Sequence, residues 1–148
     1  MVNPEFVRML EDSGIPDADF DARCIMEQVT GKSLEMLFIS GISSEDENPI
    51  RNMTQRRAFH EPLQYILGEW EFYGMRLFVG KGVLIPRPDT ETLVDSVLTW
   101  CKNREISHII DLCTGSGCIA ITLNLENPVF KVMAADNSEN ALEVTAMN

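Results

Sequence analysis

The sequence predicts a mixed α/β protein in three consecutive parts: a helical bundle, a linker with a β-hairpin, and the first half of a domain with a doubly wound parallel sheet. Residues 1–60 carry apolar side chains at helical spacing between glycine and proline stops. Residues 61–88 hold aromatic and apolar runs around Gly74, which is typical of a hairpin, and residues 89–148 alternate helical and strand periods. We therefore expect domain boundaries near residues 60 and 88.

The first part is expected to contain short helices with recognisable caps. Asparagine and serine cap the starts of helices, proline suits the first helical position, and glycine lies past the ends. The polar stretch 43–48 is expected to be a loop, followed by a helix over residues 50–60 that Pro62 stops. The other expected helices run from Pro4 to before Gly14, from Asp17 to before Gly31, and from Ser33 to Gly41.

The second half is expected to switch to strands. Pro86 and Pro88 hold the chain extended after the hairpin, and Asp89 or Thr90 is expected to cap the helix that follows. The remaining elements form a βαβα run. They are a strand from Ile106 through Asp111, a helix through Leu125, a strand over residues 130–135 and a helix from Ser138.

Composition excludes several classes of function. Twelve basic residues against 23 acidic ones give a net charge of −11 over 148 residues, so no nucleic-acid or anionic-lipid surface is expected. An acidic surface suits a basic protein partner instead. No apolar run is long enough for a membrane span, and the amino terminus shows no leader, so we expect a cytoplasmic protein whose four cysteines are reduced.

The strongest local motif is the glycine-containing stretch 111–117 at a strand-to-helix junction. Glycine lets a ligand approach the backbone closely, and the helix N-terminus presents free N–H groups. Asp136 ends the next strand, where its carboxylate can accept hydrogen bonds from ribose hydroxyls. The pattern predicts an adenosine-type cofactor, held by Asp111, Cys113, Thr114, Gly115, Ser116, Gly117 and Asp136.

Several alternatives remain at this turn. Residues 115–120 also fit the dinucleotide pattern, and Asp136 lies 19 residues after Gly117, so NAD stays open. Asp111 favours S-adenosyl-L-methionine, because a carboxylate there would attract an ammonium group and repel a diphosphate. A tight turn without any ligand is the plainest alternative. A zinc site at Cys113, Cys118 and His108 is not expected, because no second cysteine pair follows.

Longer motifs resemble one family. These are Glu61-Pro-Leu-Gln-Tyr-Ile-Leu-Gly68, the segment Ile85-Pro-Arg-Pro-Asp-Thr-Glu91, and the motifs around residues 111–120 and 134–138. The chain resembles HemK-type methyltransferases, which use S-adenosyl-L-methionine to methylate the N5 of a glutamine in peptide-chain release factors. The resemblance implies a helical substrate-recognition domain at 1–60, a linker at 61–88, and the first half of a Rossmann-like methyltransferase domain at 89–148. It also places Arg87, Thr90 and Glu91 near the mouth of the cofactor and substrate site.

Two departures from the family pattern matter. Cys113 occupies a position where glycine is common, which is tolerable if its φ angle stays negative. The Asn-Pro-Pro-Tyr motif, which in the family holds the substrate amide, is absent from the 148 residues. No catalytic residue is therefore assigned, and this chain alone is expected to be inactive. A non-catalytic, release-factor-binding module is the alternative, and self-association through an incomplete sheet is a further expectation.

Overall fold

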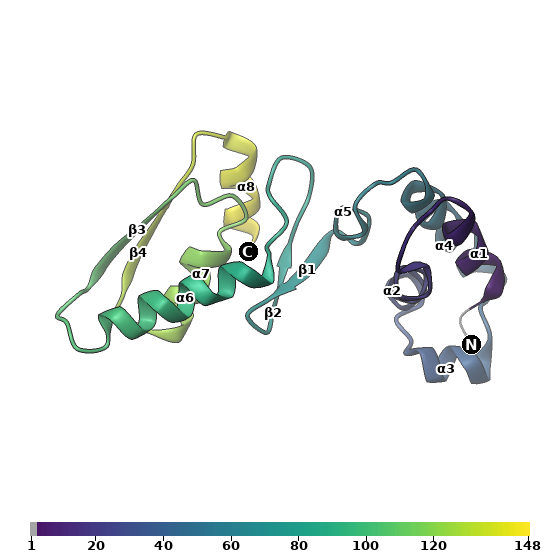
Figure 1. Cartoon of the computed structure of the whole chain (residues 1–148), viewed down its shortest axis with the longest axis horizontal. Helices are drawn as coiled ribbons and strands as arrows, with labels where there is room; N and C mark the ends of the chain where they lie inside the picture. The colour runs from purple at the N-terminus through teal and green to yellow at the C-terminus, as the bar shows by residue number, and fades with distance from the viewer. Residues whose placement is uncertain (1–2) are drawn as a thin grey trace. The chain divides into compact units, whose positions relative to one another are not determined.

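A computed structural model of the chain describes residues 3–148. It divides into two compact units, one ending at Leu67 and one running from Gly68 to Asn148. The first unit is helical, and the second contains all the strands found in the described residues (Figure 1). Each unit is described by itself below.

The helical unit begins with three helices that the sequence predicts, and the first and third of them have a side-chain cap. The Asn3 side chain accepts a hydrogen bond from the N–H of Glu5 at 3.0 Å, and Ser33 caps its helix in the same way from Met36. Gly31 ends the second helix in a left-handed conformation. The helices of this unit are α1 (Pro4–Asp12), α2 (Ala18–Thr30), α3 (Leu34–Ser40), α4 (Ser44–Ala58) and α5 (Leu63–Leu67).

The predicted loop over residues 43–48 is wrong, because this stretch is the beginning of α4. Ser43 caps the helix: its Oγ accepts the N–H of Asp46 at 3.2 Å and donates to the Asp46 carboxylate at 2.7 Å. Three acidic residues in the first turn suit the positive end of the helix. Pro49 lies inside the helix and removes one backbone hydrogen bond there. Residues 63–67, expected to belong to the linker, form the short helix α5.

The core of this unit lies between α1, α2 and α4. Phe6, Leu10, Ile25 and Ile50 are fully buried, and each such side chain contributes about 1.5–3 kcal/mol. Across the same packing, Arg57 Nε of α4 donates to Asp21 Oδ2 of α2 at 2.6 Å. The ion pair is largely buried, so loss of either partner would leave an unpaired charge inside the unit.

The second unit opens with the predicted hairpin. Strands β1 (Glu69–Phe72) and β2 (Met75–Phe78) pair antiparallel, with Phe72 opposite Met75. The turn residues Tyr73 and Gly74 have φ angles of 52° and 73°, the mirror-image conformation that matches the twist of two strands. After an extended segment, α6 (Pro88–Cys101) begins.

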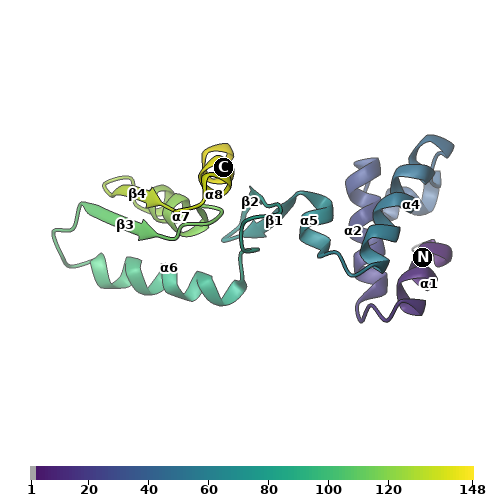
Figure 2. The same ribbon diagram turned by 90° about the horizontal axis from the view of Figure 1, so that it is seen from above.

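The rest of the unit is a βαβα run, as predicted. Strands β3 (His108–Leu112) and β4 (Lys131–Ala135) are parallel, with Ile110 opposite Met133. Helix α7 (Cys118–Glu126) connects them, and α8 (Glu139–Met147) follows β4 (Figures 1 and 2). In the described residues the architecture is therefore a mixed α/β unit with two small, two-stranded sheets.

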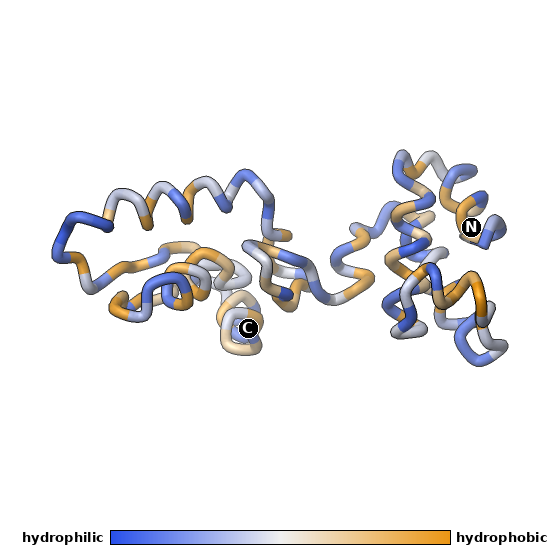
Figure 3. Tube along the Cα trace, turned by 90° about the horizontal axis from the view of Figure 1, so that it is seen from below, coloured by the Kyte–Doolittle hydropathy of each residue, from blue (hydrophilic) through white to orange (hydrophobic). Residues whose placement is uncertain are grey.

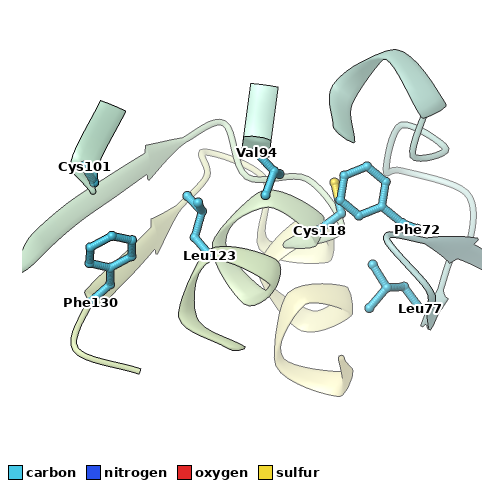
Figure 4. Close-up of a cluster of buried hydrophobic side chains, with 7 residues drawn as sticks. All are labelled: Phe72, Leu77, Val94, Cys101, Cys118, Leu123 and Phe130. Carbon is cyan, nitrogen blue, oxygen red and sulfur yellow. The ribbon is translucent and has the colours of Figure 1, made fainter. Parts of the chain in front are cut away.

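Buried side chains from the hairpin, α6, α7 and the residue before β4 form one core cluster (Figure 4). Its members are Phe72, Leu77, Val94, Cys101, Cys118, Leu123 and Phe130. The opposite face of the β3–β4 sheet is bare: Ile110, Leu112 and Met133 are 61%, 72% and 62% exposed. Figure 3 shows the apolar character of these strands along the chain trace. No helix among residues 3–148 is long and apolar enough to cross a membrane.

Candidate functional site

The glycine turn, residues 113–117, connects β3 to α7 at the carboxyl ends of the two parallel strands. Cys113, Gly115 and Gly117 have φ angles of 62°, 59° and 79°. The condition under which a cysteine would be tolerated without strain at this position, a negative φ, is therefore not met. Turning from the strand into the helix within five residues requires left-handed conformations, and the first of them falls on a residue with a β-carbon.

Gly117 is required by space as well as by its φ angle. A β-carbon there would lie 2.8 Å from Thr145 Cγ2 and 3.0 Å from Ile121 Cδ1. Helix α8 therefore packs directly against the start of α7, and a larger residue at 117 would push the two helices apart.

Asp136 follows β4 and reaches across to the glycine turn. Its Oδ2 accepts the N–H of Gly115 at 2.9 Å, and its Oδ1 accepts the N–H of Ser138 at 3.0 Å. These backbone donors, Gly115 first, lower the pKa of Asp136 below its ordinary value. The group is thus a carboxylate at neutral pH and ties the turn to the strand beside it.

Asp111 supplies a second carboxylate on the other strand. The Thr114 hydroxyl donates to Asp111 Oδ2 at 2.6 Å, and the Thr114 N–H donates to the carbonyl of Ala135 at 3.0 Å. The structure therefore brings Asp111, Thr114, Gly115 and Asp136 together, as the motif predicts. Ser116 and Thr114 are buried beneath the turn, at 2% and 6% exposure.

The three residues expected near the mouth lie at the start of α6. Arg87 is the N-cap residue, so the predicted cap by Asp89 or Thr90 is wrong; Pro88 occupies the first turn and sets the boundary earlier. Glu91 Oε1 accepts the N–H of Tyr73 at 2.7 Å and joins α6 to the hairpin. Within residues 3–148, no hydrogen bond joins Arg87, Thr90 or Glu91 to the glycine turn, and they remain predicted mouth residues.

Two side chains that the sequence prediction did not assign to the site contact the turn from α8 and its C-cap. The Thr145 hydroxyl donates to the carbonyl of Gly115 at 2.9 Å, and Asn148 Nδ2 donates to the carbonyl of Ser116 at 2.9 Å. They lie about 30 residues after the motif, so the motif itself does not mark them. The three-residue spacing that places them on one side of a helix was the available signal.

In the described part of this unit, neither a metal cluster nor the main cavity offers a second site. Across the residues that the structure describes, no group of three or more His, Cys, Asp or Glu side chains could hold a metal ion. A cavity of about 800 Å³ is lined by the end of α6 and the segments before β3 and β4, including Lys102, Ser107 and Asn127. It lies at the amino ends of the strands, whereas ligands of open α/β sheets bind at the carboxyl ends.

Comparison with known proteins finds a matching domain model and several relatives of one kind. Residues 5–68 match the model of the PrmC N-terminal domain. Over 146 residues, or 96% of its length, the chain is 38% identical to a release factor glutamine methyltransferase of Fusobacterium nucleatum. The chain is a homologue of the release factor glutamine methyltransferases. The resemblance seen in the sequence motifs is thereby confirmed.

Other relatives give the same result. The release factor glutamine methyltransferase of Thermodesulfovibrio yellowstonii is 46% identical over 109 residues, which is 72% of this chain. That of Bordetella pertussis is 38% identical over 148 aligned residues, or 95% of the chain. The matched regions are 39%, 41% and 52% of the Thermodesulfovibrio, Fusobacterium and Bordetella proteins, so the chain spans about half of their length or less.

Proposed function

We propose that this chain is the cofactor-binding part of an S-adenosylmethionine-dependent methyltransferase that modifies the side-chain amide N5 of a glutamine in a peptide-chain release factor. The names of the relatives support the reaction and the substrate. The single structural observation that carries the proposal is the glycine turn with a carboxylate at the carboxyl end of each adjoining strand, Asp111 within β3 and Asp136 just after β4.

The residues present fit S-adenosylmethionine. Asp111 would attract its ammonium group, Asp136 would accept hydrogen bonds from ribose hydroxyls, and residues 113–117 would approach the ligand through their backbone. Each Asp136 oxygen holds one backbone N–H, and a carboxylate oxygen can accept a second bond. When bound, the cofactor supplies an electrophilic methyl group on a positively charged sulfur.

The same geometry disfavours NAD. A diphosphate over a glycine turn needs free backbone N–H donors, and the Gly115 N–H is already used by Asp136. The N–H groups of Thr114 and Gly117 are also used, by the carbonyls of Ala135 and Thr114. A diphosphate would in addition lie near two carboxylates, which repel it. The turn therefore suits a ligand with a positive charge better than one with two negative charges.

Methyl transfer to an amide needs a group that orients its poorly nucleophilic nitrogen. The Asn-Pro-Pro-Tyr motif that does this in the family does not occur in the 148 residues. We therefore expect the chain by itself to bind cofactor without transferring the methyl group. Incubation with labelled S-adenosylmethionine and a release factor tests this, and methylated glutamine above the enzyme-free control would contradict it.

The helical unit is proposed to recognise the release factor. Helix α3 exposes Met36, Phe38 and Ile39 at 57%, 73% and 86%, an apolar surface that a protein partner would cover. The same observation favours the second candidate, a module that binds the release factor without any catalysis. Loss of release-factor pull-down in the Phe38→Ser variant of the whole chain, together with no cofactor binding by the unaltered chain, would select that alternative.

We also place the protein in the cytoplasm. Cys24, Cys101, Cys113 and Cys118 are all free thiols in the structure, which suits a reducing compartment. The net charge of −11 supports the expectation that no nucleic acid is bound directly.

Cofactor binding at the turn can be detected through the exposed thiol of Cys113. Alkylation by iodoacetamide, followed residue by residue with mass spectrometry, should slow at Cys113 when S-adenosylhomocysteine is present. Cys24 in the helical unit is the internal control and should react at an unchanged rate. Equal rates at Cys113 with and without the ligand would contradict the proposed site.

A further inference from the structure

The glycine turn is held from behind by two side chains at the end of α8. Thr145 donates its hydroxyl proton to the Gly115 carbonyl at 2.9 Å, and Asn148 donates from Nδ2 to the Ser116 carbonyl at 2.9 Å. Two consecutive carbonyls of the turn are thus bonded by two residues three positions apart. The Thr145 methyl group also lies over Gly117, where a β-carbon at residue 117 would be only 2.8 Å from it.

Asn148 bonds to the hairpin at the same time. Its Oδ1 accepts the N–H of Phe78 at 2.6 Å, and its Nδ2 donates to the Phe78 carbonyl at 3.1 Å. The amide therefore pairs with both backbone groups of Phe78, as a neighbouring strand residue would. With the bond to Ser116, one side chain uses its acceptor and both of its donor hydrogens.

Fixing a carbonyl also fixes the N–H of the same peptide plane. In a planar trans peptide the C=O and N–H point in opposite directions. The Gly115 carbonyl points to Thr145, so the N–H of Ser116 must point away from α8. The Ser116 carbonyl points to Asn148, which likewise fixes the direction of the Gly117 N–H, bonded to the carbonyl of Thr114 at 2.9 Å.

We propose that Thr145 and Asn148 are positioning residues, which set the shape of the glycine turn and, through it, the affinity for the cofactor. The second half of this statement rests on the proposed function. Neither side chain needs to touch the ligand, because both act on peptide groups of the turn: Thr145 sets the direction of the Ser116 N–H, and Asn148 holds the peptide whose Gly117 N–H closes the turn on Thr114. Without them, Gly115 and Gly117 would leave the turn free to rotate its peptide planes.

Three variants and one control separate positioning of the turn from general stability. Thr145→Val removes the hydroxyl at nearly constant volume, and Thr145→Ser restores it. Asn148→Ala removes all three hydrogen bonds of the side-chain amide. Glu143→Ala, at an exposed position on the same helix, is the matched control that should change nothing. Two readouts are used on the whole chain: the Kd for S-adenosylhomocysteine, and the amide NMR shifts of Ser116 and Gly117 without ligand.

The proposal predicts that Thr145→Val and Asn148→Ala weaken S-adenosylhomocysteine about tenfold, with shifted Ser116 and Gly117 amides. Thr145→Ser should restore both readouts, which a general loss of packing would not do. Tight binding with unaltered amide shifts in Thr145→Val would overturn the proposal. If the unaltered chain binds no S-adenosylhomocysteine, the proposed function fails, and the amide shifts alone test the positioning role. Ser116 and Gly117 shifts that change in Thr145→Val and return in Thr145→Ser support that role. Shifts that do not change in Thr145→Val overturn it.

Discussion

At the scale of single residues, Cys113 has a backbone conformation that favours glycine over any residue with a β-carbon. A left-handed φ of 62° costs a residue with a β-carbon about 1–2 kcal/mol, and glycine avoids that cost. A change of Cys113 to glycine would remove this cost, but part of the gain in stability would be lost because glycine is more flexible in the unfolded chain. The net effect of replacing Cys113 should therefore be small and stabilising.

We predict that Cys113→Gly raises the free energy of unfolding of the second unit by about 1 kcal/mol. Both tryptophans, Trp70 and Trp100, belong to that unit, so denaturation followed by tryptophan fluorescence reports on it. Cys113→Ala is the control: it removes the thiol but keeps the β-carbon, and should give no gain. Equal stabilisation by alanine would show that the thiol, not the backbone angle, was the cause.

Tyr73 provides a residue-scale prediction about pH. Its hydroxyl donates to Asp95 Oδ1 at 2.7 Å, and this bond to a carboxylate raises the pKa of Tyr73 to about 12. A raised pKa means that the bond is fully present below the ordinary pKa of 10.0 and is lost as the pH rises through about 12.

Absorbance titration of tyrosinate in the Tyr65→Phe variant measures Tyr73 alone, because the chain has only two tyrosines. The midpoint should lie well above 10.0 and fall toward that value when Asp95→Ala is added. A midpoint that Asp95→Ala leaves in place would show that this hydrogen bond is not the cause of the shift.

At the scale of elements, α4 is where the sequence prediction was wrong. Its first turns are polar, and the search for apolar periodicity misses a helix whose buried side begins only at Ile50 and Thr54. The capping signal was present, since Ser43 is followed three residues later by an acidic side chain.

We predict that Ser43→Ala lowers the free energy of unfolding of the helical unit by about 1 kcal/mol. Far-UV circular dichroism during urea denaturation is the measurement. Ser44→Ala, at the exposed first position of the same helix, is the control and should have a much smaller effect. If the Ser43 cap contributes nothing, Ser43→Ala and Ser44→Ala will have the same free energy of unfolding.

Local signals predicted the elements of the second unit better than their contacts. Glycine and proline positions marked the hairpin, the turn and α6, because backbone restrictions act within a few residues. The carboxyl ends of adjacent parallel strands brought Asp111 and Asp136 to the same turn, as a pattern argument can foresee. That Asp136 bonds the Gly115 N–H, and that Thr145 and Asn148 bond the turn from α8, depends on packing between distant segments, which no local pattern encodes.

At the scale of the whole molecule, the bare face of the β3–β4 sheet carries the next prediction. A parallel sheet is normally covered on both faces, and strand edges without a partner pair readily with other chains. Ile110, Leu112 and Met133 form an exposed apolar surface on these two short strands. We expect the chain to self-associate through this face, or else to keep residues 106–135 loosely ordered.

Light scattering should give an apparent mass above the 16.7 kDa of one chain, rising with concentration. Leu112→Lys should reduce it, whereas Leu125→Lys, an exposed apolar position on α7, is the matched control that should not. A monodisperse monomer with strong amide protection across residues 106–135 in hydrogen exchange would contradict both forms of this expectation.

The central claim, that the glycine turn and its two carboxylates hold S-adenosylmethionine, is tested most directly by calorimetric titration of the 148-residue chain with S-adenosylhomocysteine and, separately, with NAD. We expect binding of S-adenosylhomocysteine only, weakened at least about tenfold by Asp136→Ala and unchanged by Asp12→Ala in the helical unit. Binding of NAD, or an S-adenosylhomocysteine affinity that Asp136→Ala leaves unchanged, would contradict it.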